Sequence, residues 1–253
     1  MKPPVLELEN VALSLSGNEV LKSVSLRVEE GERLVVLGPS GSGKSTILRL
    51  ILGMLRPSRG VVRFRGREIP RLSRWKLNLI RQRIGMVYQY SALISSLTVH
   101  DNLALPLQEL TRKSRSEIDD AVQSKLEMVG MADTGDKLPS QLSGGMRKRV
   151  GLARALMLDP ELILYDEPSA GLDPMISAVI DELMIRTGEQ TGAASVIVTH
   201  ELDSAFKVAT RIAMLVGGEI IADGQPDSFR DHPDDRVRAF IAAEPNPEMI
   251  NQT

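Results

Sequence analysis

The chain of 253 residues contains no cysteine, few aromatic residues (3%) and no long apolar run. The absence of cysteine excludes disulfides, cysteine-ligated zinc and a thiol nucleophile, and it suits a reducing compartment. No apolar run reaches the roughly 18–20 residues of a membrane-spanning helix. Glu7 and Glu9 lie where a signal peptide would have its apolar stretch. We therefore expect a soluble, intracellular protein.

An excess of charge of one sign is also missing, because 31 basic residues face 33 acidic ones and the formal net charge is −2. This balance gives no global attraction to nucleic acid or anionic lipid. The apolar fraction of 42% is enough for a sizeable core, which excludes disorder as the main state. Residues 63–83 are an exception, with eight basic residues and Glu68 as the one acid, a local charge of +7. Two interpretations are open, a solvated face with internal ion pairs or a contact with an acidic partner near the membrane.

Apolar runs alternate with helical patterns along the chain. Strand patterns of period two or of unbroken apolar residues cover 5–11, 24–28, 33–37, 162–165 and 195–198. Helical patterns cover 44–52, 117–129, 144–157 and 175–187. This alternation predicts an α/β fold with a parallel central sheet. Gly217 and Gly218 predict a tight hairpin turn between 211–216 and 219–222.

A helical insertion is predicted at about 90–140, since 97–138 shows only amphipathic helical patterning. We expect a single domain over 1–243. The polar tail 244–253, with Pro245 and Pro247, is expected to be disordered or extended along a partner.

A phosphate-binding loop follows the predicted strand at 33–37. Its residues, which fit the pattern G-x-x-x-x-G-K-[ST], are Gly38, Pro39, Ser40, Gly41, Ser42, Gly43, Lys44 and Ser45. Glycines let backbone N–H groups turn toward phosphate oxygens, and the following helix points its positive end at the same anion. Lys44 is expected to reach the β and γ oxygens and Ser45 to ligate Mg²⁺. We expect the loop and Thr46 to bind a nucleotide.

Two carboxylates end the predicted strand at 162–165. Asp166 is placed to bind Mg²⁺ directly or through water, and Glu167 to act as general base toward an attacking water. A strand that merely ends in acidic turn residues is the alternative.

A second anion-binding pattern occupies 142–146. Ser143 is a natural N-cap, and Gly144 and Gly145 leave the following helix N-terminus open. The alternative is an ordinary capped helix whose basic face, with Arg147, Lys148, Arg149 and Arg154, is solvated.

These elements, in this order and spacing, resemble the nucleotide-binding subunit of ATP-binding cassette transporters over about residues 5–224. The elements are the loop at 38–45, Gln89, the signature 142–146, Asp166 with Glu167, the run 169–173, and His200 after a buried strand. The resemblance implies a P-loop NTPase core with a mostly parallel central sheet, an N-terminal antiparallel β subdomain and an inserted helical subdomain. It also implies an ATPase that uses Mg²⁺ and forms ATP-sandwich dimers with a second copy of itself.

The resemblance also assigns roles to residues of this chain. Catalysis would involve Lys44, Gln89, Glu167 and His200. Ser45, Gln89 and Asp166 would hold the metal. Ser143, Gly144, Gly145 and Asp173 would contact nucleotide. Leu15 departs from the pattern, because the family usually has an aromatic residue there that stacks on adenine, so base selectivity is expected to be weak.

A narrower resemblance, to the Mla/Mce branch, rests on Met146 in the signature and on 88–93, 99–107 and 235–240. It implies movement of phospholipids or other hydrophobic molecules between membranes. The implied partners are an integral-membrane permease docked beside 89–94, a STAS-type regulatory subunit and an MCE substrate-binding protein. The implied location is the cytoplasmic face of the inner membrane, peripheral through the permease.

Two alternatives stay open. One is a transporter ATPase for another cargo, by export or by uptake of a small polar solute. The other is a non-transport cassette ATPase acting on DNA or ribosomes. Proteins of the second kind typically add a second cassette, a long coiled coil or zinc-binding cysteines. This sequence shows none of these features, so no nucleic-acid partner is expected.

Overall fold

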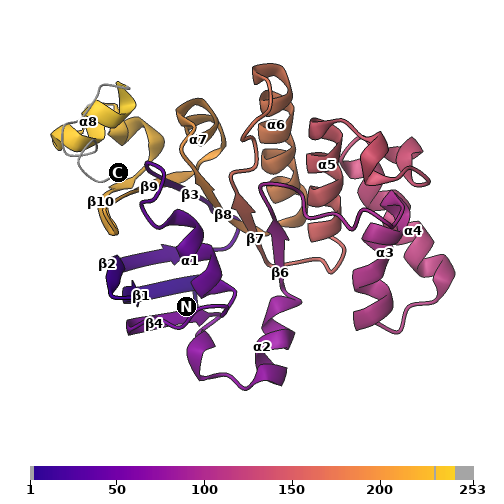
Figure 1. Ribbon diagram of the computed structural model, residues 1–253, viewed down its shortest axis with the longest axis horizontal. Coiled ribbons are helices and arrows are strands. Elements are labelled where there is room, and N and C mark those ends of the chain that lie inside the picture. Colours follow the sequence, from indigo (N-terminus) through magenta and orange to yellow (C-terminus); the bar gives the residue numbers. More distant parts are fainter. Residues whose placement is uncertain (1–2, 231, 243–253) are drawn as a thin grey trace. The chain divides into compact units, whose positions relative to one another are not determined.

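The computed structural model describes residues 3–230 and 232–242 (Figure 1). The chain divides into two compact units, Met1–Ser73 with Val196–Thr253, and Arg74–Ser195. We call these the first unit and the second unit. The predicted tail 244–253 lies outside the described residues. Every helix in the described part of the chain is too short or too polar to span a lipid bilayer.

An antiparallel sheet forms one part of the first unit. Its strands are β1 (Leu6–Leu15), β2 (Asn18–Val28), β4 (Arg59–Phe64) and β5 (Arg67–Glu68), in the order β2-β1-β4-β5. Leu6 and Leu8 are buried, as the alternation predicts. On the other face of the sheet, Arg63 lies opposite Glu7 and its guanidinium is 3.1 Å from the Glu7 carboxylate. The sheet therefore has one apolar face and one face with cross-strand ion pairs.

Further strands of the first unit are β3 (Arg33–Leu37), β9 (Arg211–Val216) and β10 (Glu219–Gly224). β3 and β9 are parallel, and β9 and β10 form the predicted hairpin, in which Gly217 and Gly218 have φ of 54° and 80°. The helices of this unit are α1 (Lys44–Ile51), α7 (Leu202–Val208), α8 (Asp235–Ile241) and the short η1 (Ile69–Arg71) and η4 (Pro226–Phe229). The buried strand β3 leads straight into the phosphate loop and α1.

The second unit combines two parallel strands, β6 (Ile84–Val87) and β7 (Leu162–Asp166), with a group of helices. Its helices are α2 (Arg74–Arg81), α3 (Val99–Leu110), α4 (Arg115–Met128), α5 (Gly144–Ala155), α6 (Pro174–Thr191) and the short η2 (Ala132–Thr134) and η3 (Pro139–Gln141). Helices α3, α4 and α5 pack on one another. His100 on α3 and Asp119 on α4 are 3.0 Å apart. The region predicted to be helical thus contains α3 and α4.

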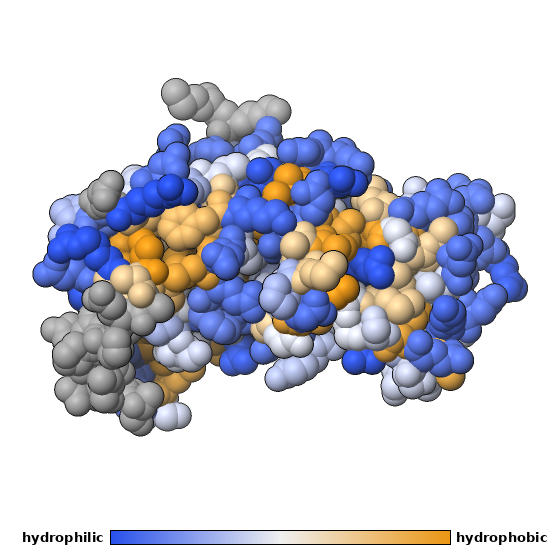
Figure 2. Space-filling view, turned by 90° about the horizontal axis from the view of Figure 1, so that it is seen from above, coloured by the Kyte–Doolittle hydropathy of each residue, from blue (hydrophilic) through white to orange (hydrophobic). Residues whose placement is uncertain are grey.

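The strand order of the six-stranded sheet is β10-β9-β3-β8-β7-β6, where β8 is Ala194–Thr199. The parallel pairs β3–β9 and β6–β7 and the antiparallel pair β9–β10 make it a mixed, mostly parallel sheet. The sequence patterns did not predict β4, α2 or β6. On the face seen in Figure 2, hydrophilic residues predominate and apolar ones are exposed in patches between them.

Four arginines of the basic segment 63–83 form ion pairs within the chain. The pairs are Arg63 with Glu7 and Glu9, Arg65 with Glu30, Arg71 with Glu68, and Arg83 with Glu161. The interpretation as internal ion pairs is confirmed for these residues, and contact with an acidic partner stays a hypothesis.

Candidate functional site

The phosphate loop of the first unit requires glycine for two separate reasons. A Cβ on Gly38 would lie 2.1 Å from the Leu215 carbonyl oxygen on β9, so the loop leaves the sheet against neighbouring backbone. Gly43, the N-cap of α1, has φ 104°, and a Cβ there would lie 2.8 Å from Leu21. L side chains rarely adopt this backbone conformation. The glycines therefore allow the loop to turn tightly onto the start of α1.

Lys44 is the first residue of α1 and is 6% exposed. Its ammonium group donates to the carbonyl oxygens of Gly38 (2.7 Å) and Pro39 (2.9 Å), so the cation is held inside the curve of the loop. The N–H groups of a first helical turn have no acceptor within the helix, which favours an anion at this end. The Ser42 hydroxyl is buried without a hydrogen-bond partner, and a buried hydroxyl in that state is suited to a ligand oxygen. These features favour phosphate binding by the loop, Ser45 and Thr46, which stays a prediction.

His200 also belongs to the first unit and follows β8, the strand next to β3 in the sheet order. Its side chain is exposed, and the Thr199 hydroxyl accepts a hydrogen bond from Glu201 N (3.0 Å) where the chain enters α7. The phosphate loop and His200 therefore follow neighbouring strands.

In the second unit the chain turns sharply after β7. Glu167 has φ 47°, the left-handed region that costs a non-glycine residue energy and is often found at functional sites. Its carbonyl oxygen accepts hydrogen bonds from the Lys148 ammonium (3.2 Å) and from Ala170 N (3.3 Å). Asp166 and Glu167 are both half-buried. Next to them, burial raises the pKa of Tyr165.

The signature segment begins α5. The Ser143 hydroxyl caps the helix by accepting from Met146 N (3.3 Å), as predicted. A Cβ on Gly145 would lie 2.5 Å from Ile176 Cγ2 on α6, whereas one on Gly144 would meet Leu172 at 3.5 Å. Packing therefore requires glycine at position 145, independently of the predicted anion contact.

Asp173 was predicted to contact nucleotide, and the structure shows what else it does. Its carboxylate accepts from Met175 N (3.0 Å) and Ile176 N (3.1 Å) as the N-cap of α6. The nucleotide contact stays a prediction for this exposed residue.

Gln89 is half-buried and precedes a turn that is built on strained backbone. Ser91 and Ala92 have φ of 60° and 47°. The Arg154 guanidinium on α5 donates to both of their carbonyl oxygens, at 2.9 and 2.6 Å. Burial lowers the pKa of Arg154. The turn after Gln89 is thus fixed to α5 by one side chain.

Three positioning residues were missed from the sequence. Lys148 (7% exposed) and Arg154 were counted as part of a solvated basic face, which is wrong because their cations hydrogen-bond backbone carbonyls. Asn102 (1% exposed) holds residues 94–98 by accepting from Ile94 N and donating to the Ile94, Leu97 and Thr98 carbonyls. The sequence does not predict this role of Asn102, because a single polar residue in an amphipathic helix does not itself indicate burial.

Hard oxygen donors for Mg²⁺ occur in both units, the Ser45 hydroxyl in the first and the Asp166 carboxylate and Gln89 amide in the second. Mg²⁺ is commonly held by one or two carboxylates together with substrate phosphates. The described residues contain no cluster of three or more His, Cys, Asp or Glu that could hold an ion. These donor types suit Mg²⁺ brought with a nucleotide, and its binding by these residues stays a prediction.

At the predicted base site, Leu15 is the last residue of β1, pairs with Asn18 and is 38% exposed. It offers apolar contact to a base but no ring to stack on. The expectation of weak base selectivity stays a prediction.

The chain is similar in sequence to known proteins. A family profile described as ABC transporter matches residues 21–170. "Probable ribonucleotide transport ATP-binding protein mkl" of Mycobacterium leprae is 39% identical over 236 residues, which is 93% of this chain and 68% of that protein. "Intermembrane phospholipid transport system ATP-binding protein MlaF" of Escherichia coli is 36% identical over 237 residues, 94% of this chain and 88% of that protein.

Solved structures are similar over nearly the whole fold. A dimeric post-hydrolysis state of the ATP-binding cassette MJ0796, bound to ADP and Pi, has a TM-score of 0.79 at 34% identity and covers 87% of this chain and 98% of its own. The cbiO1 structure from Clostridium perfringens, part of the complex cbiONQ, has a TM-score of 0.85 at 27% identity and covers 99% of this chain and 98% of its own. These similarities confirm the predicted fold class.

Proposed function

We propose that this chain, which belongs to the ABC transporter family as an ATP-binding subunit that hydrolyses ATP to ADP and phosphate, powers the movement of phospholipid or another hydrophobic molecule between membranes. The observation that supports this cargo is the 36% identity to MlaF across 94% of the chain, a protein named for intermembrane phospholipid transport. The Mycobacterium leprae relative is named for ribonucleotide transport. Ribonucleotide is therefore the competing cargo.

Two copies of the chain sandwich two ATP molecules in this proposal. Each nucleotide lies between the phosphate loop of one copy and the signature of the other. Two features support it, namely that the chain carries two anion-binding helix N-termini, at Lys44 and Ser143, and that the similar MJ0796 cassette is dimeric. Because ATP contacts both copies only when they are closed together, binding favours closure and hydrolysis releases it.

The proposal divides the work of hydrolysis among several predicted site residues. Water attacks the γ-phosphorus in line, the bond to the β–γ bridging oxygen breaks, ADP leaves, and Glu167 accepts the proton of the water. Lys44 stabilises the β and γ oxygens, and His200 holds the γ-phosphate and the attacking water. Ser45, Asp166 and Gln89 would hold Mg²⁺, which when bound would neutralise charge on the phosphates. Ser143 of the opposing copy completes the anion site.

The proposal also includes membrane partners for the chain. The chain acts within a transporter complex with membrane components. We place it at the cytoplasmic face of the inner membrane, with its permease docked beside 89–94 and α3. A STAS-type subunit and an MCE protein are the expected accessory partners. The exposed Tyr90 (87%) and Ile94 (41%) supply apolar area for the permease contact.

The cargo is tested by purifying the chain with its partners from detergent-solubilised membranes and identifying bound proteins and small molecules by mass spectrometry. The proposal predicts a permease and co-purifying phospholipid, and ATPase activity that lipid-loaded partners stimulate. Recovery of a ribonucleotide-binding receptor without lipid would replace the phospholipid assignment. Stimulation by DNA or RNA in place of a permease would favour the non-transport alternative.

A further inference from the structure

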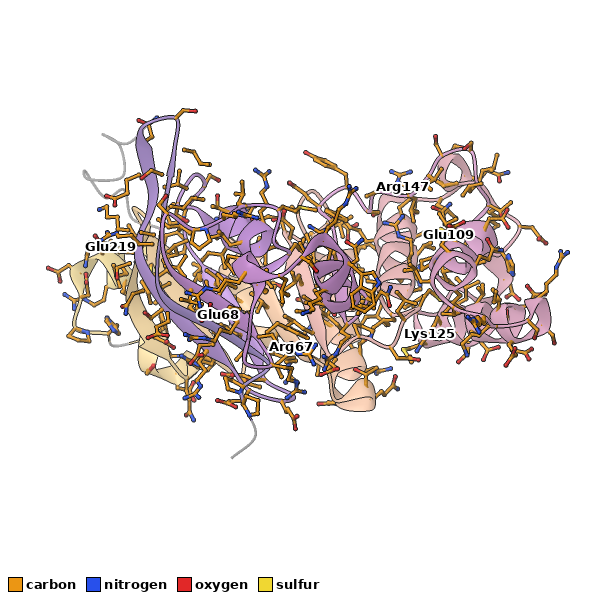
Figure 3. All side chains as sticks on the ribbon, turned by 90° about the horizontal axis from the view of Figure 1, so that it is seen from below. Arg67, Glu68, Glu109, Lys125, Arg147 and Glu219 are labelled. Carbon is orange, nitrogen blue, oxygen red and sulfur yellow. The ribbon has the colours of Figure 1, made fainter. Side chains whose placement is uncertain are left out.

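Helix α2 presents two large apolar side chains to solvent. Trp75 is 68% exposed and Leu79 is 40% exposed, whereas Ile80 is 2% exposed. Trp75 and Leu79 are four residues apart and share one face of the helix, while Ile80 lies on the buried face. Figure 3 shows the side chains of the described residues as sticks. The helix is therefore anchored on one face and apolar on the other.

Cations surround this apolar face. From Ile69 to Arg83 the chain carries five basic residues and no carboxylate, namely Arg71, Arg74, Lys76, Arg81 and Arg83. Arg71 and Arg83 are in ion pairs with Glu68 and Glu161. Arg74 and Lys76 adjoin Trp75 in the chain and are exposed. The helix thus combines an apolar wedge with positive charge at its edges.

The size of this surface favours a membrane over a protein as its partner. A standard protein interface buries about 800 Å² per partner, whereas a Trp side chain buries about 150–250 Å², and α2 is only 8 residues long. Tryptophan rings favour the headgroup level of a bilayer, and Lys and Arg stems let their charges reach anionic headgroups. A short apolar wedge flanked in the sequence by Arg74 and Lys76 meets both requirements at once.

We propose that Trp75 and Leu79, together with Arg74 and Lys76, form a site on α2 that binds the anionic surface of a phospholipid membrane. A single wedge with few cations binds reversibly and depends on salt. A membrane protein in the same complex already holds the chain at the bilayer. This raises the effective concentration of the α2 site at the membrane, so that even a weak contact forms. The site orients the subunit against the bilayer, and it binds lipid without nucleotide, so its failure would leave the ATPase and cargo assignments standing.

The chain carries its own reporter, because Trp75 is its one tryptophan. The full chain is mixed with vesicles of phosphatidylcholine alone, or of phosphatidylcholine with phosphatidylglycerol, and tryptophan emission is recorded. The proposal predicts a blue shift with the anionic vesicles that is reversed by salt at about 0.5 M. No shift with either vesicle, or an equal shift with both, would overturn it.

Vesicle flotation of variants distinguishes binding through this site from non-specific binding to the membrane. Trp75→Glu, and separately Arg74→Glu with Lys76→Glu, should each weaken partitioning to anionic vesicles at least about 10-fold. Met54→Glu removes another exposed apolar side chain (57% exposed), and Arg112→Glu with Arg115→Glu makes the same change in charge elsewhere. Both controls should bind as the unchanged chain does. Equal loss in controls and test variants, or α2 variants that bind normally and fail only to capture an acidic protein, would contradict the proposal.

Discussion

Individual glycines determine how closely the phosphate-binding segments pack against their neighbours. Gly38 lies against the carbonyl oxygen of Leu215, and Gly145 lies against Ile176. The sequence motifs predicted these glycines from the need of an anion for open backbone N–H groups. The structure adds a packing requirement that a motif cannot contain, because the neighbouring atoms come from β9 and α6, far away in sequence.

The adjacent glycines of the signature allow a matched comparison. In Gly145→Ala the new methyl group would lie 2.5 Å from Ile176 Cγ2, and relief of such overpacking costs about 1–3 kcal/mol of unfolding free energy. In Gly144→Ala the nearest atom is at 3.5 Å, and helix propensity raises stability by up to about 1 kcal/mol. Urea unfolding of both variants measures the difference. Equal stabilities would show that the packing at Gly145 is not as described.

Three buried or half-buried cations differ in how far the sequence predicts their surroundings. Lys44 was located by its motif, and the structure places it inside the phosphate loop. Lys148 and Arg154 belong to no motif, and composition counts a cation as solvated unless its partners are known. Their partners are backbone carbonyls of segments 19 and about 62–63 residues away, which no local pattern indicates.

At the scale of elements, the turn at 91–92 connects the Gln89 segment to helix α5. Two consecutive residues in left-handed conformation are costly, and the Arg154 guanidinium bonds both carbonyls. Gly151, one turn earlier on α5, packs against Ser91, and a Cβ added at Gly151 would lie 3.3 Å from Ser91 Cβ. A movement of α5 should therefore move the turn, and with it the segment after Gln89.

Arg154→Ala should loosen this turn. It removes the donor to the carbonyl of buried Ser91 and to that of exposed Ala92. An unsatisfied buried group costs about 1–3 kcal/mol, so amide hydrogens of 88–94 should exchange faster in hydrogen–deuterium exchange. Arg154→Lys should be intermediate, because one ammonium group does not reproduce the fork of a guanidinium. Arg149→Ala, whose guanidinium donates to Gly130 O at 3.2 Å, is the control and should leave 88–94 unchanged. Unaltered exchange in Arg154→Ala would remove the turn's proposed anchor.

Helix α4 carries a pH-dependent cap. Ser114 and Glu117 form a capping box, in which hydrogen bonds from the Ser114 hydroxyl and backbone N–H lower the pKa of Glu117. Because the pKa is lower folded than unfolded, the cap stabilises the helix above about pH 4.3, the ordinary Glu value, and the benefit is lost as pH falls through the lowered pKa. Ser114→Ala should cost about 1 kcal/mol near neutrality and less in acid. A cost that is independent of pH, measured by urea unfolding, would contradict this.

Elements with clear apolar periodicity were predicted, and those without it were not. The strands β3, β7 and β8 and the helices α1, α4, α5 and α6 lie where the patterns placed them, within a few residues at their ends. Helix α2 was missed because Trp75 and Leu79 face solvent, so its apolar residues do not mark one buried stripe. Strand β6 is 4 residues long and β4 contains two arginines, so neither shows a clean strand pattern.

At the scale of the whole molecule, the α/β fold followed from the sequence because each buried strand is an unbroken apolar run. The family followed from the order of six motifs, and the similar proteins confirm it. Roles that need a second copy of the chain could be predicted only from the resemblance. A Ser143 hydroxyl at the start of a helix does not indicate which copy of the chain binds the nucleotide that it contacts. The sandwich dimer is consequently the central claim.

A slow-hydrolysing variant makes this claim measurable. Glu167→Gln keeps the size of the side chain but removes the general base, which commonly costs about 10²–10⁴-fold in rate. ATP binding should persist, and the closed dimer should accumulate. Glu167→Gln combined with Ser143→Asp is the matched control, because aspartate still caps α5 but repels the γ-phosphate of the opposing nucleotide.

The most direct measurement is the molar mass of Glu167→Gln by size-exclusion chromatography with light scattering, with and without ATP and Mg²⁺. The account predicts the 27.7 kDa monomer without nucleotide, a doubling of that mass with Mg-ATP, and no doubling in the Ser143→Asp combination. A Glu167→Gln protein that stays monomeric with Mg-ATP, even beside its permease, or that hydrolyses ATP at nearly the normal rate, would contradict it.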